Sequence, residues 1–504
     1  MTAYDLYLVS PYLALAALAM LVIVADLVTR RTGLLVAISF VGLAAPAALS
    51  AWQLADLTSS GASQLSAEGS VILYTLSIDR FALFFNFLIL AAVGLVVLAS
   101  NDYVRRMQRL QGEYFGLMLL SATGMMLLAA TNELISIYIA LELTTLPLAA
   151  LAAFLPNARS SEAGMKFLIV GAISSAVMLY GMALIYGFTG STRLDEIAIA
   201  LATSSQSGAL PFGSMAVLLA VVLLLAGFGF KMSAAPFQMW VPDVYEGAPT
   251  PVVAFLSVAS KAAAFALVLR VFYIGFDALG GDWWVLLAGL AALSMTIGNL
   301  VAIAQRNIKR MFGYSTIAHA GYILVGVAAV ATVDDESLTF GPSSVLFYLA
   351  AYAAANLTAF FAIVCIGNRI NSDEIEDYAG MLRRAPFLAI ALALALIALI
   401  GVPPTSIFMA KIYIFAAAIN TGESLMTWLV IIGVVNSVVS AYYYLRVIKV
   451  MFLQPAIHTE RLGGSWPVNV ALGVAALCMI WLGVAPATIL GAAEQAAVVL
   501  LAGG

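Results

Sequence analysis

The chain has 504 residues, of which 63% are hydrophobic and only 10% are charged, and its formal net charge at pH 7 is −4. Soluble domains carry about 25% charged residues, so this composition excludes a soluble globular fold. Apolar runs of about 20 residues recur along nearly the whole length. Because each span in lipid must satisfy its own backbone hydrogen bonds, these runs predict an all-α polytopic membrane protein.

The apolar runs predict about fourteen transmembrane spans. In chain order they cover residues 7–28, 34–54, 81–100, 112–130, 134–155, 163–187, 214–240, 252–273, 283–304, 312–333, 343–368, 386–419, 425–451 and 466–490. No basic region precedes the first span, which favours a retained N-terminus over a cleaved signal peptide or transit sequence. An even number of spans places both termini on one side of the membrane.

Lysine and arginine are unevenly distributed between the loops, and cytoplasmic loops are normally the ones enriched in them. The odd-numbered loops and their helix ends hold Arg30, Arg31, Arg105, Arg106, Arg109, Arg159, Lys166, Arg306, Lys309, Arg310, Arg369, Arg383, Arg384, Arg446, Lys449 and Arg461. The even-numbered ones hold only Arg80, Arg193 and Arg270, with acidic residues in "VDDES" at 333–337. This asymmetry predicts that the odd-numbered loops face the cytoplasm and that both termini lie on the outer side of the membrane.

Several titratable side chains fall inside the predicted spans, namely Glu142, Lys231, Lys261, His319 and Lys411. A lysine near the bilayer centre costs about 2.5 to 3.5 kcal/mol on insertion, so something must offset these charges. A structural ion pair of Glu142 with Lys231 or Lys261 would explain one lysine and leave two over. The surplus favours a hydrated polar path through the protein interior.

Polar side chains accompany these groups at the spacing of helical neighbours. They are Ser257 for Lys261, Tyr138 and Thr145 for Glu142, and Ser315, Thr316 and Tyr322 for His319. Such stripes could hold water, although serine and threonine hydroxyls also commonly bond to carbonyls of their own helix. Burial disfavours a charged lysine and a nearby carboxylate favours it, so a Glu142–Lys231 pair is predicted to handle protons.

Two predicted spans are interrupted by proline. Pro236 lies in the interior of span seven, where it removes a backbone hydrogen bond and clashes with the carbonyl four residues earlier. In span twelve the sequence "LIGVPPTSIFMAK" places Pro403 and Pro404 two turns before Lys411. Interrupted spans in corresponding places are typical of transporters built from internal repeats, with ion sites near the midplane.

The breaks correspond if spans four to eight and nine to thirteen are two five-helix units. Glu142 then corresponds to His319, and Lys231 corresponds to Lys411. Because five is odd, the second unit enters the membrane from the opposite side and the repeats are inverted. The predicted domains are 1–110 with three helices, 111–273 and 274–451 with one repeat each, and 452–504 with a C-terminal helix and tail.

Cysteine usage and motifs predict no redox centre and no metal site in this chain. Its two cysteines, Cys365 and Cys478, lie in separate apolar runs, which leaves no disulfide framework or iron–sulfur spacing. Neither a GxGxxG motif nor a phosphate-binding loop occurs.

Three segments resemble one family of membrane proteins. The sequence "FKMSAAPFQMWVPDVYEGAPTPVVAFLSVASKAAAFALVLR" at 230–270 closely resembles the seventh and eighth helices of N-type subunits of the proton-pumping NADH:quinone oxidoreductase, respiratory complex I. "NIKRMFGYSTIAHAGYIL" at 307–324 and "GVPPTSIFMAKIYIF" at 401–415 are similar to its tenth and twelfth helices. The resemblance covers about residues 80–450 well, and the terminal helices only by hydropathy.

The resemblance implies a proton relay. By similarity its members are the helix-five glutamate Glu142, the helix-seven lysine Lys231, the bridging lysine Lys261, the helix-ten residue His319 and the exit lysine Lys411. A lysine at position 411 fits the N type, whereas a glutamate would suggest the M type. The resemblance also implies M-type and K-type neighbours, an L-type subunit further along the membrane arm, and NADH, FMN, iron–sulfur clusters and quinone in partner subunits.

Two other functions remain open at this stage. A cation/proton antiporter subunit of the related Mrp type would use the same buried charges without a redox partner, and a non-transporting scaffold would use them only to lock helices together. A thylakoid complex that uses ferredoxin is a less favoured setting. Asp243 and Glu246 either join the polar path or cap span eight, and the cap is favoured.

Overall fold

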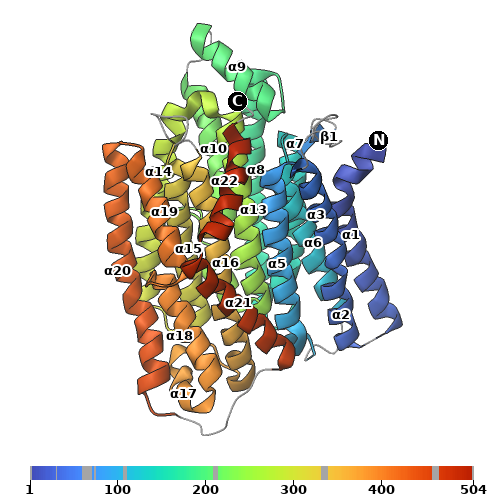
Figure 1. The fold of residues 1–504 in the computed structure, drawn as a ribbon, viewed down its shortest axis with the longest axis vertical. Coiled ribbons are helices and arrows are strands. Elements are labelled where there is room, and N and C mark those ends of the chain that lie inside the picture. Colours follow the sequence, from blue (N-terminus) through green and yellow to red (C-terminus); the bar gives the residue numbers. More distant parts are fainter. Residues whose placement is uncertain are drawn as a thin grey trace.

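The computed structural model describes residues 3–29, 31–58, 71–72, 75–105, 110–207, 214–330, 339–456 and 465–501. Within these ranges the protein is a bundle of helices (Figure 1), with one small antiparallel hairpin of β1 (Val71–Ile72) and β2 (Leu76–Ser77). Thirteen helices of the described part are long and apolar enough to cross a membrane. The predicted all-α polytopic fold is confirmed. Part of the charge asymmetry that predicts the orientation lies outside the described residues, namely Arg30, Arg106, Arg109, Arg461 and residues 333–337.

The N-terminal part supplies three crossings. They are made by α1 (Ala3–Val28), by the consecutive α2 (Thr32–Gly42) and α3 (Ala44–Thr58), and by α5 (Arg80–Val104). Asp79 begins α5, because its carboxylate accepts a hydrogen bond of 2.8 Å from the backbone N–H of Ala82 and so satisfies a free donor of the first turn.

The first five-helix group follows the predicted order, with its fourth and fifth helices in pieces. Its elements are α6 (Gln111–Ala130), α7 (Leu134–Ala152), α8 (Ala158–Thr189), α10 (Ser214–Met232) with the short α11 (Val241–Gly247), and a last helix composed of α12 (Thr250–Phe255), the π-helix η1 (Leu256–Ser260), α13 (Lys261–Arg270) and the π-helix η2 (Val271–Gly275). The helix α9 (Leu194–Ser207) projects from one end of the bundle (Figure 1).

The second group has the same order. Its elements are α14 (Gly280–Ile303), α15 (Ile308–Ala328), α16 (Phe340–Ile370), the broken pair α18 (Pro386–Ile400) and α19 (Ser406–Asn420), and α20 (Ser424–Leu453), with the short α17 (Met381–Arg384) before α18. The segment Thr250–Gly275 and the helix α16 are buried along their apolar stretches, so the core lies where the two groups meet.

The C-terminal crossing is longer than predicted. The span predicted at 466–490 is two helices, α21 (Trp466–Val484) and α22 (Ala487–Leu501). Pro486 separates them, because the residue before a proline is disfavoured in the helical conformation, and Ala485 is not helical. Figure 1 shows that α21 is tilted and that α22 continues from it towards the end of the molecule where both termini lie.

The helix α21 also contacts the second break. Gly483 has no side chain, and a Cβ at this position would overlap the carbonyl oxygen of Pro404. The C-terminal part of the chain is therefore packed directly against the interruption between α18 and α19.

Candidate functional site

The interruption predicted in span seven is a full break between two helices. The helix α10 ends at Met232, four residues before Pro236, which is the position whose carbonyl a proline ring would meet if the helix continued. The predicted C-terminal end of the span 214–240 is therefore wrong, because residues 233–240 are non-helical. The carbonyl of Phe230 near the end of α10 accepts a hydrogen bond of 3.1 Å from the indole of Trp240. The peptide bond before Pro236 is cis.

Lys231 lies in the last turn of α10 and is 3% exposed. Its Nζ donates a hydrogen bond of 2.5 Å to Oγ1 of Thr145 on α7. That hydroxyl in turn donates to the carbonyl of Leu141 at 2.6 Å, so Thr145 bonds to its own helix and to the lysine at the same time. The amine also lies near the C-terminal end of its own helix, where the partial negative charge of the helix dipole favours a cation.

Glu142 is half-buried on α7, one turn from Thr145. Its Oε1 accepts a hydrogen bond of 2.5 Å from the hydroxyl of Ser175 on α8. The carboxylate acts electrostatically on Lys231, but no nitrogen of Lys231 or Lys261 lies within the 4.0 Å of an ion pair with it. The direct ion pair that was the structural alternative is not formed within the described residues, where the hydroxyls of Ser175 and Thr145 lie next to the two charges.

Lys261 is 2% exposed and begins α13, directly after the π-helix η1. Its Nζ donates a hydrogen bond of 2.6 Å to the carbonyl of Thr316 on α15, and lies 5.5 Å from the ring centroid of Tyr352 on α16. The predicted neighbour Ser257 bonds instead to the carbonyl of Ala254 in its own helix. Single π-helical turns within α-helices occur frequently at functional sites.

His319 lies on α15 among aromatic side chains and is 2% exposed. Its Nδ1 lies 2.7 Å from the hydroxyl of Tyr348. The imidazole centroid is 5.0 Å from the ring of Tyr352 and 5.8 Å from that of Tyr322. Thr316 shares a hydrogen bond of 2.8 Å with the hydroxyl of Tyr352, so the surroundings of Lys261 and His319 are continuous.

Lys411 lies on α19 and is 6% exposed. Its Nζ donates to the carbonyl of Ile400, the last residue of α18, at 2.8 Å, and to the hydroxyl of Ser437 at 3.0 Å. The same Nζ lies 4.5 Å from the ring centroid of Tyr322, whose hydroxyl accepts a bond of 3.3 Å from Ser437. Tyr322 therefore separates His319 from Lys411 while contacting both.

The structure thus brings three of the predicted residues together in space. Lys261 and His319 share Tyr352 as a neighbour, and His319 and Lys411 share Tyr322. Glu142 and Lys231 form a second group through Thr145. Within the described residues no hydrogen bond joins Lys231 to Lys261. Helical spacing in the sequence does not predict the contacts of Tyr348, Tyr352, Ser437 and Ser175, because each of these residues lies on a different helix from the titratable residue that it contacts.

Asp243 and Glu246 belong to a separate ionic cluster. Asp243 accepts from Lys166 at 2.6 Å and from Arg310 at 2.7 Å, and Glu246 accepts from Arg310 at 2.9 Å. Burial alone would raise the pKa of Asp243, but the hydrogen bonds from Lys166 and Arg310 outweigh it and lower that pKa. The favoured prediction that these acids cap span eight is wrong, since α12 has no side-chain cap.

Arg270 was grouped with an outer loop and is instead 1% exposed. Its guanidinium binds both carboxylate oxygens of Asp79, at 2.9 and 3.0 Å, and its Nε donates to the carbonyl of Ala129 at 3.0 Å. The pair ties the start of α5 to α13 and to the end of α6. Hydropathy misplaced Arg270 because it lies near the end of its span.

The described residues contain no group of three or more histidine, cysteine, aspartate or glutamate side chains placed to hold a metal ion.

Comparison with known proteins decides the family. The transmembrane family described as NADH:quinone oxidoreductase/Mrp antiporter matches residues 131–440, which include the five titratable residues of the site. The chain belongs to this family. The subunit N of NADH-quinone oxidoreductase from Dehalococcoides mccartyi is a family relative with 45% identity over 423 residues, covering 83% of this chain and 86% of that protein. The subunit N from Trichlorobacter lovleyi is 41% identical over 499 residues, covering 98% and 97%.

Solved structures agree with this family. A chain of respiratory complex I from Thermus thermophilus with bound aureothin is 32% identical, with a TM-score of 0.76 over 95% of this chain and 98% of that one. A chain of the Mrp complex from Dietzia sp. superimposes with a TM-score of 0.83 over 99% and 98%, and at 20% identity it shows the shared fold alone. The resemblance to N-type subunits seen in the sequence is confirmed.

Proposed function

We propose that the chain translocates protons as the N-type membrane subunit of an NADH:quinone oxidoreductase. The relay consists of Glu142, Lys231, Lys261, His319 and Lys411. The observation that carries this proposal is the buried series in which Tyr352 lies between Lys261 and His319, and Tyr322 lies between His319 and Lys411. Buried ionisable residues within a membrane are costly and mark proton relays in pumps and transporters.

Each member has the chemistry that its step requires. An imidazole can accept a proton on one ring nitrogen and release it from the other, and Nδ1 of His319 already contacts the hydroxyl of Tyr348. The two amines on the broken helices, Lys231 and Lys411, each lie at a helix C-terminus that favours the protonated form. Unit charges about 6 Å apart interact by roughly 3 kcal/mol at an effective dielectric of 20, so a proton at one member disfavours a proton at the next.

The proposal extends to the assembly and its orientation. The chain lies in a bacterial plasma membrane with both termini on the periplasmic side, beside M-type and K-type subunits, with an L-type subunit further along. NADH, FMN, iron–sulfur clusters and quinone belong to partner subunits, whose reaction drives the relay. The two five-helix groups act as inverted repeats with the boundaries 111–273 and 274–451.

Replacement of Lys231 by methionine tests the relay. We expect the Lys231→Met complex to assemble, and proton translocation by the reconstituted complex to fall well below that of the unchanged protein. The control is Arg193→Gln, because the ion pairs of Arg193 are with Asp195 and Glu196 in the first turn of α9 and not with a relay residue. Normal proton translocation per NADH oxidised in Lys231→Met would refute the relay, and failed assembly with normal translocation in the remaining complex would favour the scaffold.

Co-purification separates the redox assembly from an Mrp-type antiporter. An affinity-tagged chain, extracted in mild detergent, is expected to bring down subunits that contain flavin and oxidise NADH. Their consistent absence would overturn the assignment to an oxidoreductase while leaving the relay itself intact.

A further inference from the structure

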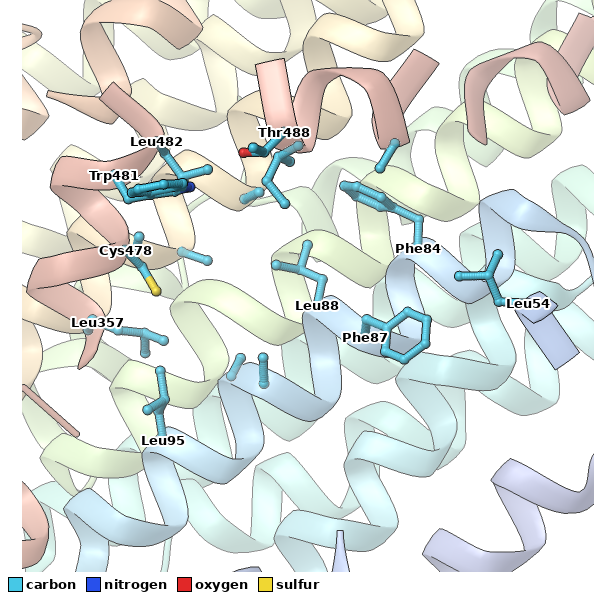
Figure 2. A pocket seen from close by; sticks show the side chains of 18 of the residues that line it. Leu54, Phe84, Phe87, Leu88, Leu95, Leu357, Cys478, Trp481, Leu482 and Thr488 are labelled. Carbon is cyan, nitrogen blue, oxygen red and sulfur yellow. The ribbon is translucent and has the colours of Figure 1, made fainter. Parts of the chain in front are cut away.

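An apolar cavity of about 580 Å³ lies apart from the relay, between α5, α16 and the C-terminal helices α21 and α22. Figure 2 shows Phe84 and Leu88 of α5, Leu357 of α16, and Trp481 and Leu482 of α21 around this space. None of the five relay residues is among the side chains that line it. Its size falls within the range of about 300 to 1,000 Å³ typical of ligand pockets.

The dimensions of the cavity fit one extended hydrocarbon chain. Its lining on α5 runs from Arg80 to Leu95, which at 1.5 Å per residue is about 22 Å. One leaflet of the hydrocarbon core is about 15 Å thick, so the cavity reaches from a membrane surface past the midplane. Its volume of about 580 Å³ over this length gives a mean cross-section of about 26 Å². A helix about 10 Å across occupies roughly 80 Å², so the cavity is too narrow for a helix.

A positive charge stands at one end of the cavity. Arg80, the first residue of α5, lines it, and its side chain makes no hydrogen bond or ion pair within the described part of the chain. The adjacent carboxylate of Asp79 is already bound to Arg270, so it does not neutralise Arg80. The planar guanidinium binds phosphate through two parallel hydrogen bonds. The polar side chains of Gln495 and Thr488 also line the cavity from α22.

We propose that this cavity binds a membrane phospholipid, with one acyl chain between α5, α16 and α21–α22 and its phosphate on Arg80. The long apolar lining recognises the chain, and the guanidinium of Arg80, for which the described residues supply no partner, recognises the phosphate. The lipid fills the space under the two C-terminal helices, including Leu482, whose neighbour Gly483 contacts the second break. This binding site is independent of proton translocation by the relay.

Site-specific photo-crosslinking in the intact complex tests the proposal. Phe87, which lines the cavity, is replaced by the photoreactive p-benzoylphenylalanine, and the complex is purified and washed in excess mild detergent before irradiation. The matched control is the same replacement at Tyr442 of α20, which is 62% exposed on the bundle surface. We expect a phospholipid adduct on the α5 peptide by mass spectrometry, and none at Tyr442, where exchange with detergent is free.

An adduct at Phe87 with another polypeptide, with quinone or with detergent, or no adduct at all, overturns the proposal. Arg80→Gln tests the phosphate contact, and we expect the adduct yield to fall about tenfold, as for the loss of a hydrogen bond to a charged group. Arg80→Lys is expected to restore part of the yield. An undiminished yield in assembled Arg80→Gln complex overturns the assignment of the phosphate.

Discussion

The Nζ of Lys411 donates a hydrogen bond of 2.8 Å to the carbonyl oxygen of Ile400, the residue at which α18 ends. The last four carbonyls of a helix have no partner within that helix, and they carry its partial negative charge. The second break therefore supplies both an acceptor and a favourable field to the lysine that follows it by two turns. The break and the buried charge form one structural unit.

Gly401→Ala should disturb this unit. Gly401 has φ +93°, where an L-residue costs roughly 1–2 kcal/mol, and a Cβ there would lie 3.1 Å from Cδ of Lys411. We expect the thermal midpoint of the purified complex to fall by a few degrees and proton translocation to drop with it. Both are measured on the same preparation.

The matched control is Gly473→Ala in α21, where an added Cβ meets nothing within 4 Å. Alanine in an exposed helix is favoured over glycine by about 1 kcal/mol, so this variant should be unchanged or slightly more stable. Equal losses in the two variants would mean that crowding at Lys411 has no special effect.

Tyr348→Phe should slow the relay without weakening the fold. The substitution removes the hydroxyl that lies 2.7 Å from Nδ1 of His319 and keeps the ring. Loss of one such hydrogen bond is worth about 1.4 kcal/mol, which corresponds to an approximately tenfold slower proton translocation. Tyr378→Phe is the control, because its buried hydroxyl has no hydrogen-bond partner within the described residues. A rate in Tyr348→Phe equal to that of the control would exclude this hydroxyl from the path.

Arg270→Met should be strongly destabilising. The substitution leaves the buried carboxylate of Asp79 without its bidentate partner, and breaking a buried pair from one side costs about 3–5 kcal/mol. We expect little assembled complex, and partial recovery in the double variant Asp79→Asn with Arg270→Met, since asparagine still begins a helix well. Arg193→Met, which breaks exposed pairs, should cost less than about 1 kcal/mol. The yield of assembled complex on gel filtration should be lowest for Arg270→Met, higher for the double variant and highest for Arg193→Met.

The Asp243 cluster predicts a pH dependence with a definite sign. Since the folded pKa of Asp243 is lowered from its ordinary value of 3.8, the stability it contributes is complete above that value and is lost as pH falls below it. Asp243→Asn should therefore lower the thermal midpoint by a constant amount between pH 7 and pH 5. The difference from the unchanged protein should narrow only at about pH 4 and below, and a difference that grows on acidification would contradict the assignment.

Hydropathy and helix-breaking residues were enough to predict the order of the spans and both interruptions. Lys231 and Lys411 were found because a charge inside an apolar run has few structural explanations. The exact ends were not predictable in the same way. The position of Pro236 predicts a kink inside a continuing span, whereas the helix ends at Met232 and eight non-helical residues precede α11.

Contacts between distant helices could not be predicted from one sequence. Ser175 reaches Glu142 from α8, and Tyr348 and Tyr352 come from α16, whose sequence reads only as an apolar helix. Which face of a buried helix points to which neighbour is set by packing of the whole bundle. For the same reason the sequence places Arg270 at an outer helix end and does not indicate its partner Asp79.

The contact of Gly483 with the carbonyl of Pro404 makes the two interruptions mechanically unequal. The first is held by two hydrogen bonds, one from the indole of Trp240 to the carbonyl of Phe230 in the same segment and one of 2.8 Å from the backbone N–H of Ala235 to the hydroxyl of Ser294 on α14. The second is braced from outside by α21, which continues into α22. A displacement at the first interruption reaches α14 only through the side chain of Ser294. A displacement at the second has to carry the C-terminal helices with it.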